Sequence, residues 1–168
     1  TKSTTEGKPI NEEITFTTST GGGGGTVTDI DGNTYQTVQI GSQVWMKENL
    51  KVTRYRNGDA INYVSDATAW SNLTTGGYCY YDNLQSNAVT YGNLYNWAAI
   101  NDSRNIAPAG WHVPSYNEWI TLMNNTGGYN AAGGKLKETV NLHWNSPNNA
   151  TDEYGFTAIL NGRMQKLT

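Results

Sequence analysis

Five consecutive glycines at positions 21–25 constrain this 168-residue chain more than any other feature. Glycine loses more backbone entropy on ordering than any other residue, so such a run holds regular structure only at a large cost. The tract therefore predicts a flexible linker. Residues 1–20 are polar and rich in Thr, and we interpret them as a tether or as the last strand of an upstream module. A folded domain is expected over residues 26–168.

Strand signals dominate the first part of that domain. Val38 and Ile40 fall on one side of the alternating segment "TYQTVQI", and Gly41-Ser42 is a two-residue connection to "QVWM". Two such segments joined by so short a connection predict a β-hairpin. Further strands are expected at "YCYY", residues 78–81, and at "DEYGFTAIL" near the end of the chain.

Two later segments show the apolar spacing of helices. Residues 90–102, "TYGNLYNWAAIND", predict one amphipathic helix. In "PSYNEWITLMNNTGG", Ser115 is followed three residues later by Glu118, the pattern of a capping box, and Gly127 predicts the end of this second helix. Its apolar stripe consists of Tyr116, Trp119, Leu122 and Met123. "NAAGGKLKE" is compatible with a further short helix. Short helices and scattered strands indicate an α+β fold.

Charge and hydropathy exclude several kinds of partner. Only 15% of the residues are charged, the net charge is -3, and basic residues do not cluster, so we expect no nucleic-acid binding. No apolar run approaches the roughly 20 residues that span a bilayer, so we expect no direct membrane insertion. The start at Thr1 rather than Met is typical of a mature secreted protein or of a trimmed chain. We expect an extracellular or outer cell surface location.

The sequence offers no catalytic motif. Cys79 is the single cysteine, which excludes an intramolecular disulfide and a four-Cys zinc site, and we expect a buried thiol in a strand. His112 and His143 each lack a second His or a carboxylate at ligand spacing. We interpret His112 as a neutral imidazole that packs beside an indole and donates to a backbone carbonyl. The chain is therefore not expected to be an enzyme.

Oxygen ligands are the more plausible metal donors. The segment "WNSPNNATDEYG" brings Asn148, Asn149 and Asp152 into one loop, and amide and carboxylate oxygens of this kind can hold Ca²⁺. The alternative is a set of Asx turns, in which these side chains bond to their own backbone. Since the 12-residue spacing of an EF-hand is absent, we favour the turns and expect no cofactor other than this candidate calcium ion.

Aromatic and amide side chains are the candidates for ligand recognition. Tyr residues alternate with Asn, Asp and Arg in "RYRNGDAINYV" and "GGYCYYDNLQ". Tyr offers a large contact area at low entropic cost, and Asn supplies adaptable hydrogen bonds. The candidate ligand-binding residues are Tyr55, Tyr63, Tyr80, Tyr81 and Asn83. The expected ligand is a glycan or a protein.

Several segments together carry a family resemblance. They are "DIDGNTYQTVQIGSQVWMKENLKVTRYRNGDAI", "AWSNLTTGGYCYYDN", "YGNLYNWAAIN", "PAGWHVPSYNEW", "GGKLKE" and "GFTAI", in this order. The chain resembles the Fibrobacter succinogenes major paralogous domain of surface and secreted proteins from gut and marine Bacteroidetes-type bacteria. That family is similar in layout to the formylglycine-generating-enzyme type of C-type-lectin-like fold. The resemblance implies two short helices, a small twisted antiparallel sheet and long ordered loops.

The sequence departs from the family pattern in two places. Ala107 stands where members often carry a Cys, and the chain stops at Thr168 where members usually continue through further strands. The expected domain therefore lacks its C-terminal strands, which would leave strand edges uncovered. Truncation is the interpretation we favour. The alternative is that a partner supplies a complementing chain or strand in place of the missing strands.

Three functions remain open at this point. A non-catalytic binding module, such as an adhesin or a surface lipoprotein, is favoured by the glycine tether, the aromatic and amide-rich loops and the missing catalytic constellation. A structural subunit of a surface fibre, completed by another chain, is the alternative. A formylglycine-generating-type enzyme is less favoured. Enzymes of that type act through a pair of cysteines, and this chain has one cysteine.

Overall fold

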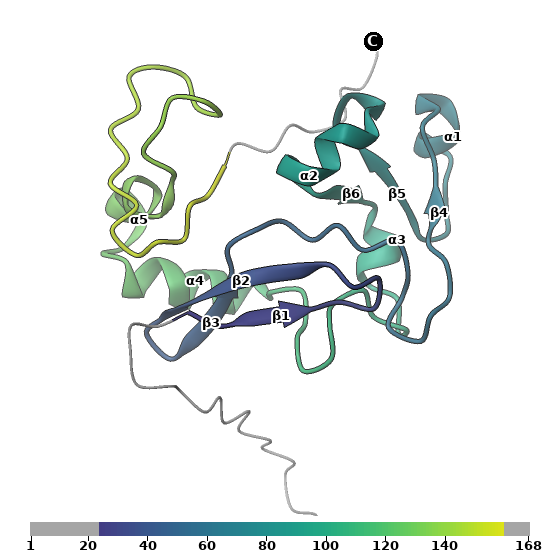
Figure 1. Cartoon of the computed structure of the whole chain (residues 1–168), viewed down its shortest axis with the longest axis horizontal. Coiled ribbons are helices and arrows are strands. Elements are labelled where there is room, and N and C mark those ends of the chain that lie inside the picture. Colours follow the sequence, from purple (N-terminus) through teal and green to yellow (C-terminus); the bar gives the residue numbers. More distant parts are fainter. Residues whose placement is uncertain (1–23, 160–168) are drawn as a thin grey trace, which may run out of the picture.

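The computed structural model describes residues 24–159, so the expectations for residues 1–20 and for most of the glycine tract lie outside the described part. The described residues form an α+β domain with two three-stranded sheets (Figure 1). The strands are β1 (Thr26–Thr28), β2 (Thr34–Ile40), β3 (Gln43–Met46), β4 (Asn62–Tyr63), β5 (Gly77–Tyr80) and β6 (Asn93–Tyr95). The α-helices are α1 (Ala67–Ser71), α2 (Ala88–Tyr91), α3 (Trp97–Ile100), α4 (Tyr116–Asn125) and α5 (Tyr129–Leu136), and 3₁₀ turns occupy η1 (Tyr81–Asn83) and η2 (Gln85–Asn87). The α+β class is thus confirmed. The described residues hold five α-helices and two sheets, where two helices and one antiparallel sheet were expected.

The first sheet has the order β1-β2-β3 and is antiparallel throughout. Gly41, at a φ of 62°, makes the predicted two-residue turn, and Ile40 pairs with Gln43 across it. Strand β1 begins at Thr26, the predicted domain boundary, and the amide of Thr37 also donates to the carbonyl oxygen of Gly25 at 2.9 Å. The hairpin prediction is confirmed.

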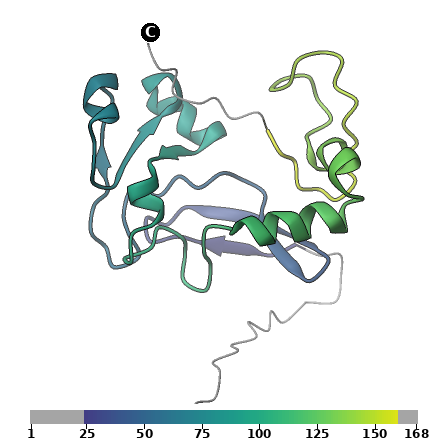
Figure 2. The same cartoon turned by 180° about the vertical axis from the view of Figure 1, so that it is seen from behind.

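Helix α4 covers one face of this sheet, as seen from behind in Figure 2. Ile40, Trp45 and Leu122 form its buried cluster, and Val38 packs against them. The capping box is confirmed, since Ser115 and Glu118 exchange the predicted hydrogen bonds at the start of α4. The apolar stripe is narrower than predicted, because Leu122 is buried whereas Tyr116 is 78% exposed. The expected short helix near residue 132 is α5.

The second sheet has the order β4-β5-β6. Strand β5 pairs in parallel with β4 and antiparallel with β6. The strand predicted at residues 78–81 is confirmed with a shift of one position, since Tyr81 already belongs to η1. A second buried cluster lies beside this sheet and contains Val52, Tyr55, Ile61, Tyr78, Ala99 and Ile106.

The helix predicted over residues 90–102 is wrong. The segment holds the end of α2, all of β6 and the whole of α3. Gly92 breaks the helix at φ 69° and ψ -164°, and the Asn96 side chain then caps α3 by accepting from the amide of Ala99 at 2.9 Å. Leu94 pairs with Cys79 in the sheet, so the apolar spacing that suggested a helix belongs in part to a strand.

The strand predicted at residues 152–160 is also wrong for its described part. The only β-pairing of residues 152–159 is an isolated bridge, in which Ala158 pairs in parallel with Lys137.

Among the described residues, no helix is both long and apolar enough to cross a membrane.

Candidate functional site

A groove of about 1130 Å³ lies between the two sheets, and we call it the central groove. Residues 42–50, which include β3, form one wall. Asn93 and Tyr95 contribute from β6, and further walls come from residues 110–114, from the beginning of α4 and from residues 156–159. The groove therefore joins parts of the chain that are more than 100 residues apart.

Aromatic rings give the groove an apolar lining. The ring centroid of Trp45 lies 4.8 Å from that of Trp119 and 6.0 Å from that of Phe156. All three residues line the groove, and Trp119 is 48% exposed. Aromatic walls with a few polar groups are typical of ligand sites.

Three buried polar atoms of groove-lining residues lack a hydrogen-bond partner among the described residues. Among the described residues, the only buried side-chain nitrogen or oxygen atoms without a partner are Oε1 of Gln43, Nε1 of Trp45 and Oδ1 of Asn93. All three residues line the central groove. Trp45 and Asn93 are each only 6% exposed, so little water reaches them. An unpaired buried donor or acceptor costs about 1–3 kcal/mol. Protein atoms cover all three atoms, so a ligand in the groove pairs with them only if these side chains turn toward it.

Arg56 fixes one wall of the groove. Its guanidinium donates to the carbonyl oxygens of Ala107 at 3.0 Å, Pro108 at 2.8 Å and Trp111 at 2.7 Å. The 107–111 loop is therefore held by a side chain more than 50 positions earlier in the chain. This role of Arg56 could not be predicted from the sequence, because an exposed Arg gives no local signal for a distant loop that it binds.

His112 and Glu118 lie together at the rim of the groove, and our interpretation of His112 is wrong. Its Nε2 is 2.6 Å from Oε1 of Glu118, and its side chain is 63% exposed. Partial burial raises the pKa of Glu118, but the hydrogen bonds from Ser115 and His112 outweigh it and leave that pKa below its ordinary value. The imidazole therefore contacts a carboxylate and not a backbone carbonyl.

His143 is not isolated either. Its Nδ1 is 2.7 Å from Oε1 of Glu138, and both side chains are largely buried. The imidazole also meets the ring of Tyr91 edge-on, with centroids 5.5 Å apart. Glu138 and His143 are five positions apart in a loop. Their contact therefore could not be predicted from a helical spacing.

The predicted ligand-binding tyrosines separate into exposed and buried rings. Tyr63 and Tyr80 lie side by side on the second sheet with centroids 5.0 Å apart, and Tyr63 is 45% exposed. We call these two rings the tyrosine patch. Tyr81 instead pairs with Tyr91 at 5.1 Å. The exposed Asn83 donates to the carbonyl oxygen of Ser65 at 3.0 Å.

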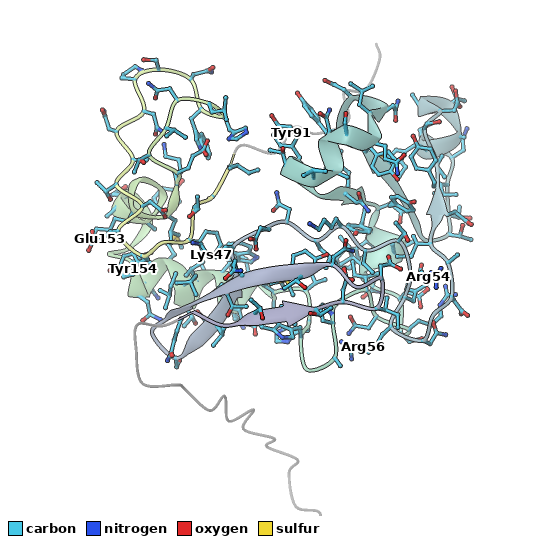
Figure 3. The ribbon with its side chains drawn as sticks, in the orientation of Figure 1. Lys47, Arg54, Arg56, Tyr91, Glu153 and Tyr154 are labelled. Atoms are coloured by element: carbon cyan, nitrogen blue, oxygen red, sulfur yellow. The ribbon has the colours of Figure 1, made fainter. Side chains whose placement is uncertain are left out.

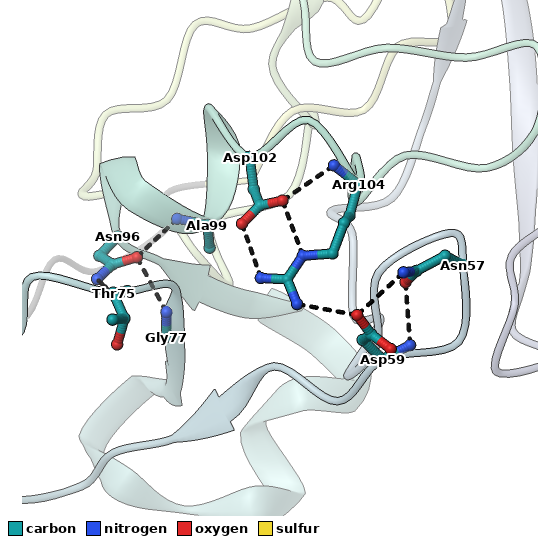
Figure 4. A network of polar contacts seen from close by, with 8 residues as sticks. All are labelled: Asn57, Asp59, Thr75, Gly77, Asn96, Ala99, Asp102 and Arg104. Atoms are coloured by element: carbon teal, nitrogen blue, oxygen red, sulfur yellow. Dashed lines mark hydrogen bonds and ion pairs between the residues drawn. The ribbon is translucent and has the colours of Figure 1, made fainter.

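Tyr55 is not available at the surface. It is only 1% exposed, and the guanidinium carbon of Arg104 lies 3.9 Å from its ring centroid. Arg104 bridges Asp102 and Asp59 with contacts of 2.8 and 3.0 Å (Figure 4). Burial raises the pKa of the Tyr55 hydroxyl. The expectation that Tyr55 contacts a ligand is therefore corrected: this ring is part of the core.

The candidate metal ligands already bond to nearby backbone and hydroxyl groups. Asn148 donates to the carbonyl oxygens of Glu138 and Val140, and Asp152 accepts from the amide and the hydroxyl of Thr157. Asn149 is exposed. Within residues 24–159, no three His, Cys, Asp or Glu side chains gather in a way that could hold a metal ion. Calcium binding remains a prediction.

Cys79 is fully buried, as expected. Its burial raises the pKa of the thiol, which disfavours the reactive thiolate form. It lies in β5, opposite Leu94.

The fold and the groove define a small α+β domain with an aromatic cleft between two sheets. A sequence model of the Fibrobacter succinogenes major domain matches residues 38–168, and the chain belongs to this family. No curated protein matches the chain, and no solved structure does so.

Proposed function

We propose that this domain is a non-catalytic extracellular binding module whose principal ligand occupies the central groove. One observation carries the proposal: the partnerless buried polar atoms of the described residues all belong to groove residues. A ligand that supplies an acceptor for Trp45 and donors for Gln43 and Asn93 would satisfy them once these side chains turn toward the groove. The C-type-lectin-like layout and display on a bacterial surface or secreted protein are part of this proposal.

The chemistry of the rim supports binding over catalysis. The hydroxyl of Ser115 and the imidazole of His112 both contact the carboxylate of Glu118. This carboxylate caps α4 and has a lowered pKa, so it is a weak base toward the hydroxyl. The buried Cys79, with its raised pKa, is poorly suited to cysteine chemistry.

A glycan is the second candidate ligand, and the tyrosine patch favours it. Tyr63 is 45% exposed beside Tyr80, and Asn83 offers an amide near the same sheet. Exposed rings present apolar faces against which a sugar ring can pack, and the hydroxyl and amide groups supply hydrogen bonds. Tyr63→Ala should then weaken glycan binding at least tenfold, while Tyr129→Ala, which removes another exposed ring, should not.

The groove itself is tested by placing a charge in it. The full chain is screened against a glycan array and a library of random seven-residue peptides. Val113 lines the groove and is 39% exposed, so Val113→Asp adds a carboxylate there with little effect on the core. Binding should fall at least tenfold in this variant and should be unchanged in Val140→Asp, a matched change outside the groove lining. Ligands insensitive to Val113→Asp, or no ligand in either screen, would contradict the proposal.

A further inference from the structure

Strand β3 leaves one edge of the first sheet unpaired within the described residues. In a two-residue hairpin, alternate residue pairs exchange hydrogen bonds. Ile40 pairs with Gln43 next to the turn, and the amide of Lys47 donates to the carbonyl oxygen of Gln36 at 2.9 Å, which continues this alternation. The peptide groups of Val44 and Met46 therefore point away from β2.

This free edge lies in the central groove, since residues 42–50 form one of its walls. An edge strand offers a row of backbone donors and acceptors to any extended chain. The apolar rings of Trp45, Trp119 and Phe156 surround the same space. Pairing along β3 would thus bring apolar side chains of a partner strand next to aromatic rings.

The unpaired side-chain atoms also match a polypeptide. Nε1 of Trp45 needs an acceptor, and Oδ1 of Asn93 needs a donor. A peptide backbone supplies both kinds of group, C=O and N–H, at every residue other than proline. Sugar hydroxyls supply them as well, but they cannot continue the ladder of a sheet.

The groove offers two ammonium groups to a partner. Lys47 and Lys137 line the groove, and neither forms an ion pair with a described residue. The two carboxylates of the lining are occupied: Glu118 contacts His112, and Glu48 accepts from the amide of Gln36. In the view of Figure 3, Lys47 lies between Tyr154 and Arg54. The two lysines and two glutamates of the lining balance in formal charge, and the ammonium groups of Lys47 and Lys137 are the charges that no described carboxylate contacts.

We propose that the central groove binds an extended polypeptide strand of a partner, which adds to the sheet along β3. The strand pairs with the peptide groups of Val44 and Met46. It carries apolar side chains at alternate positions and at least one Asp or Glu that reaches Lys47 or Lys137. This inference rests on the proposed function and names the class of its ligand.

The test uses peptides selected from the random library on the full chain. The enriched sequences should alternate apolar residues and include Asp or Glu. In hydrogen exchange followed by NMR, the best peptide should slow exchange of the Val44 and Met46 amides at least tenfold. Met46→Pro removes an outward N–H and should weaken binding at least tenfold, whereas Thr26→Pro, on the outer strand β1, should not.

A charge test does not depend on how the proline variants fold. Lys47→Gln combined with Lys137→Gln should weaken an acidic peptide about tenfold, while Lys51→Gln should leave binding unchanged, since Lys51 lies outside the central groove. Peptides that bind without protecting Val44 and Met46 would overturn strand addition. Selective binding of oligosaccharides in the groove would overturn it too and would leave the proposed binding function intact. No groove ligand of any class would overturn both.

Discussion

At the scale of single residues, the side chain of Glu118 contacts two residues with different roles. Its Oε2 accepts from the amide and the hydroxyl of Ser115, both at 2.7 Å, while its Oε1 meets His112. One carboxylate therefore closes the capping box and holds the imidazole at the rim of the groove. The start of α4 and one edge of the binding site depend on the same side chain.

Ser115→Ala tests the architectural part of this arrangement. The hydroxyl that accepts from the amide of Glu118 is lost, so the free energy of unfolding should fall by about 1 kcal/mol. Chemical denaturation measures the change. Ser103→Ala, a substitution of the same kind outside the helices, is the control. Loss of ligand binding at unchanged stability would instead give Ser115 a direct role in recognition.

Asp102 predicts a pH dependence of stability. The hydrogen bond from Arg104 lowers the pKa of Asp102 from 3.8 to about 2. A carboxylate whose pKa is lower in the folded state stabilises it above the unfolded pKa, and this contribution disappears as the pH falls. We therefore expect the free energy of unfolding to decrease as the pH falls from about 4 to about 2.

Asp102→Asn should flatten the pH dependence in that interval, as measured by thermal unfolding at a series of pH values. Asp82→Asn removes a carboxylate that forms no ion pair within residues 24–159 and serves as the control. An unchanged slope in Asp102→Asn would mean that the Arg104 contact contributes nothing to stability in solution.

At the scale of elements, Gly92 separates a helix from a strand. A Cβ at this position would lie 2.7 Å from Cβ of Asn49 and 2.7 Å from the carbonyl oxygen of Leu50. The backbone also has a φ of 69°, which side chains disfavour. The junction of α2 and β6 therefore requires glycine for two separate reasons.

Gly92→Ala should destabilise the domain by roughly 3 kcal/mol, as the sum of left-handed strain and overpacking. Gly58→Ala is a matched control, because its φ is 93° and nothing lies within 4 Å of the added carbon. It should cost only about 1 kcal/mol. Equal losses of stability in the two variants would show that the contacts with Asn49 and Leu50 relax without cost.

At the scale of the whole molecule, Trp45 joins the first sheet to α4 and to the end of the described chain. It packs in the cluster with Ile40 and Leu122 and also contacts Phe156. The same ring lines the central groove. Stability and the proposed binding site therefore share this residue.

Trp45→Ala should reduce the free energy of unfolding by about 3–5 kcal/mol, because it removes a buried aromatic ring and leaves a cavity. Trp97→Ala, at a position that is 72% exposed, should change it by less than about 0.5 kcal/mol. Urea denaturation followed by circular dichroism compares the two. A small effect of Trp45→Ala would indicate that α4 does not depend on this cluster.

Local chemistry made part of this fold predictable. The hairpin at Gly41, the capping box of Ser115 and Glu118, and the strand around Cys79 were all found from signals within a few residues. Turn conformation and helix capping depend on neighbours in the chain, so their causes can be read from a short segment. The family resemblance was also visible in the sequence, and the match over residues 38–168 confirms it.

Burial and the groove could not be read in this way. Tyr55 and Tyr63 occur in similar polar surroundings in the sequence, yet Arg104 covers the first ring and the second is half-exposed. The central groove exists because residues 42–50 and 156–159 meet across a folded molecule. Solvent exposure and cavity shape depend on contacts between distant segments, and these contacts arise only when the whole chain packs.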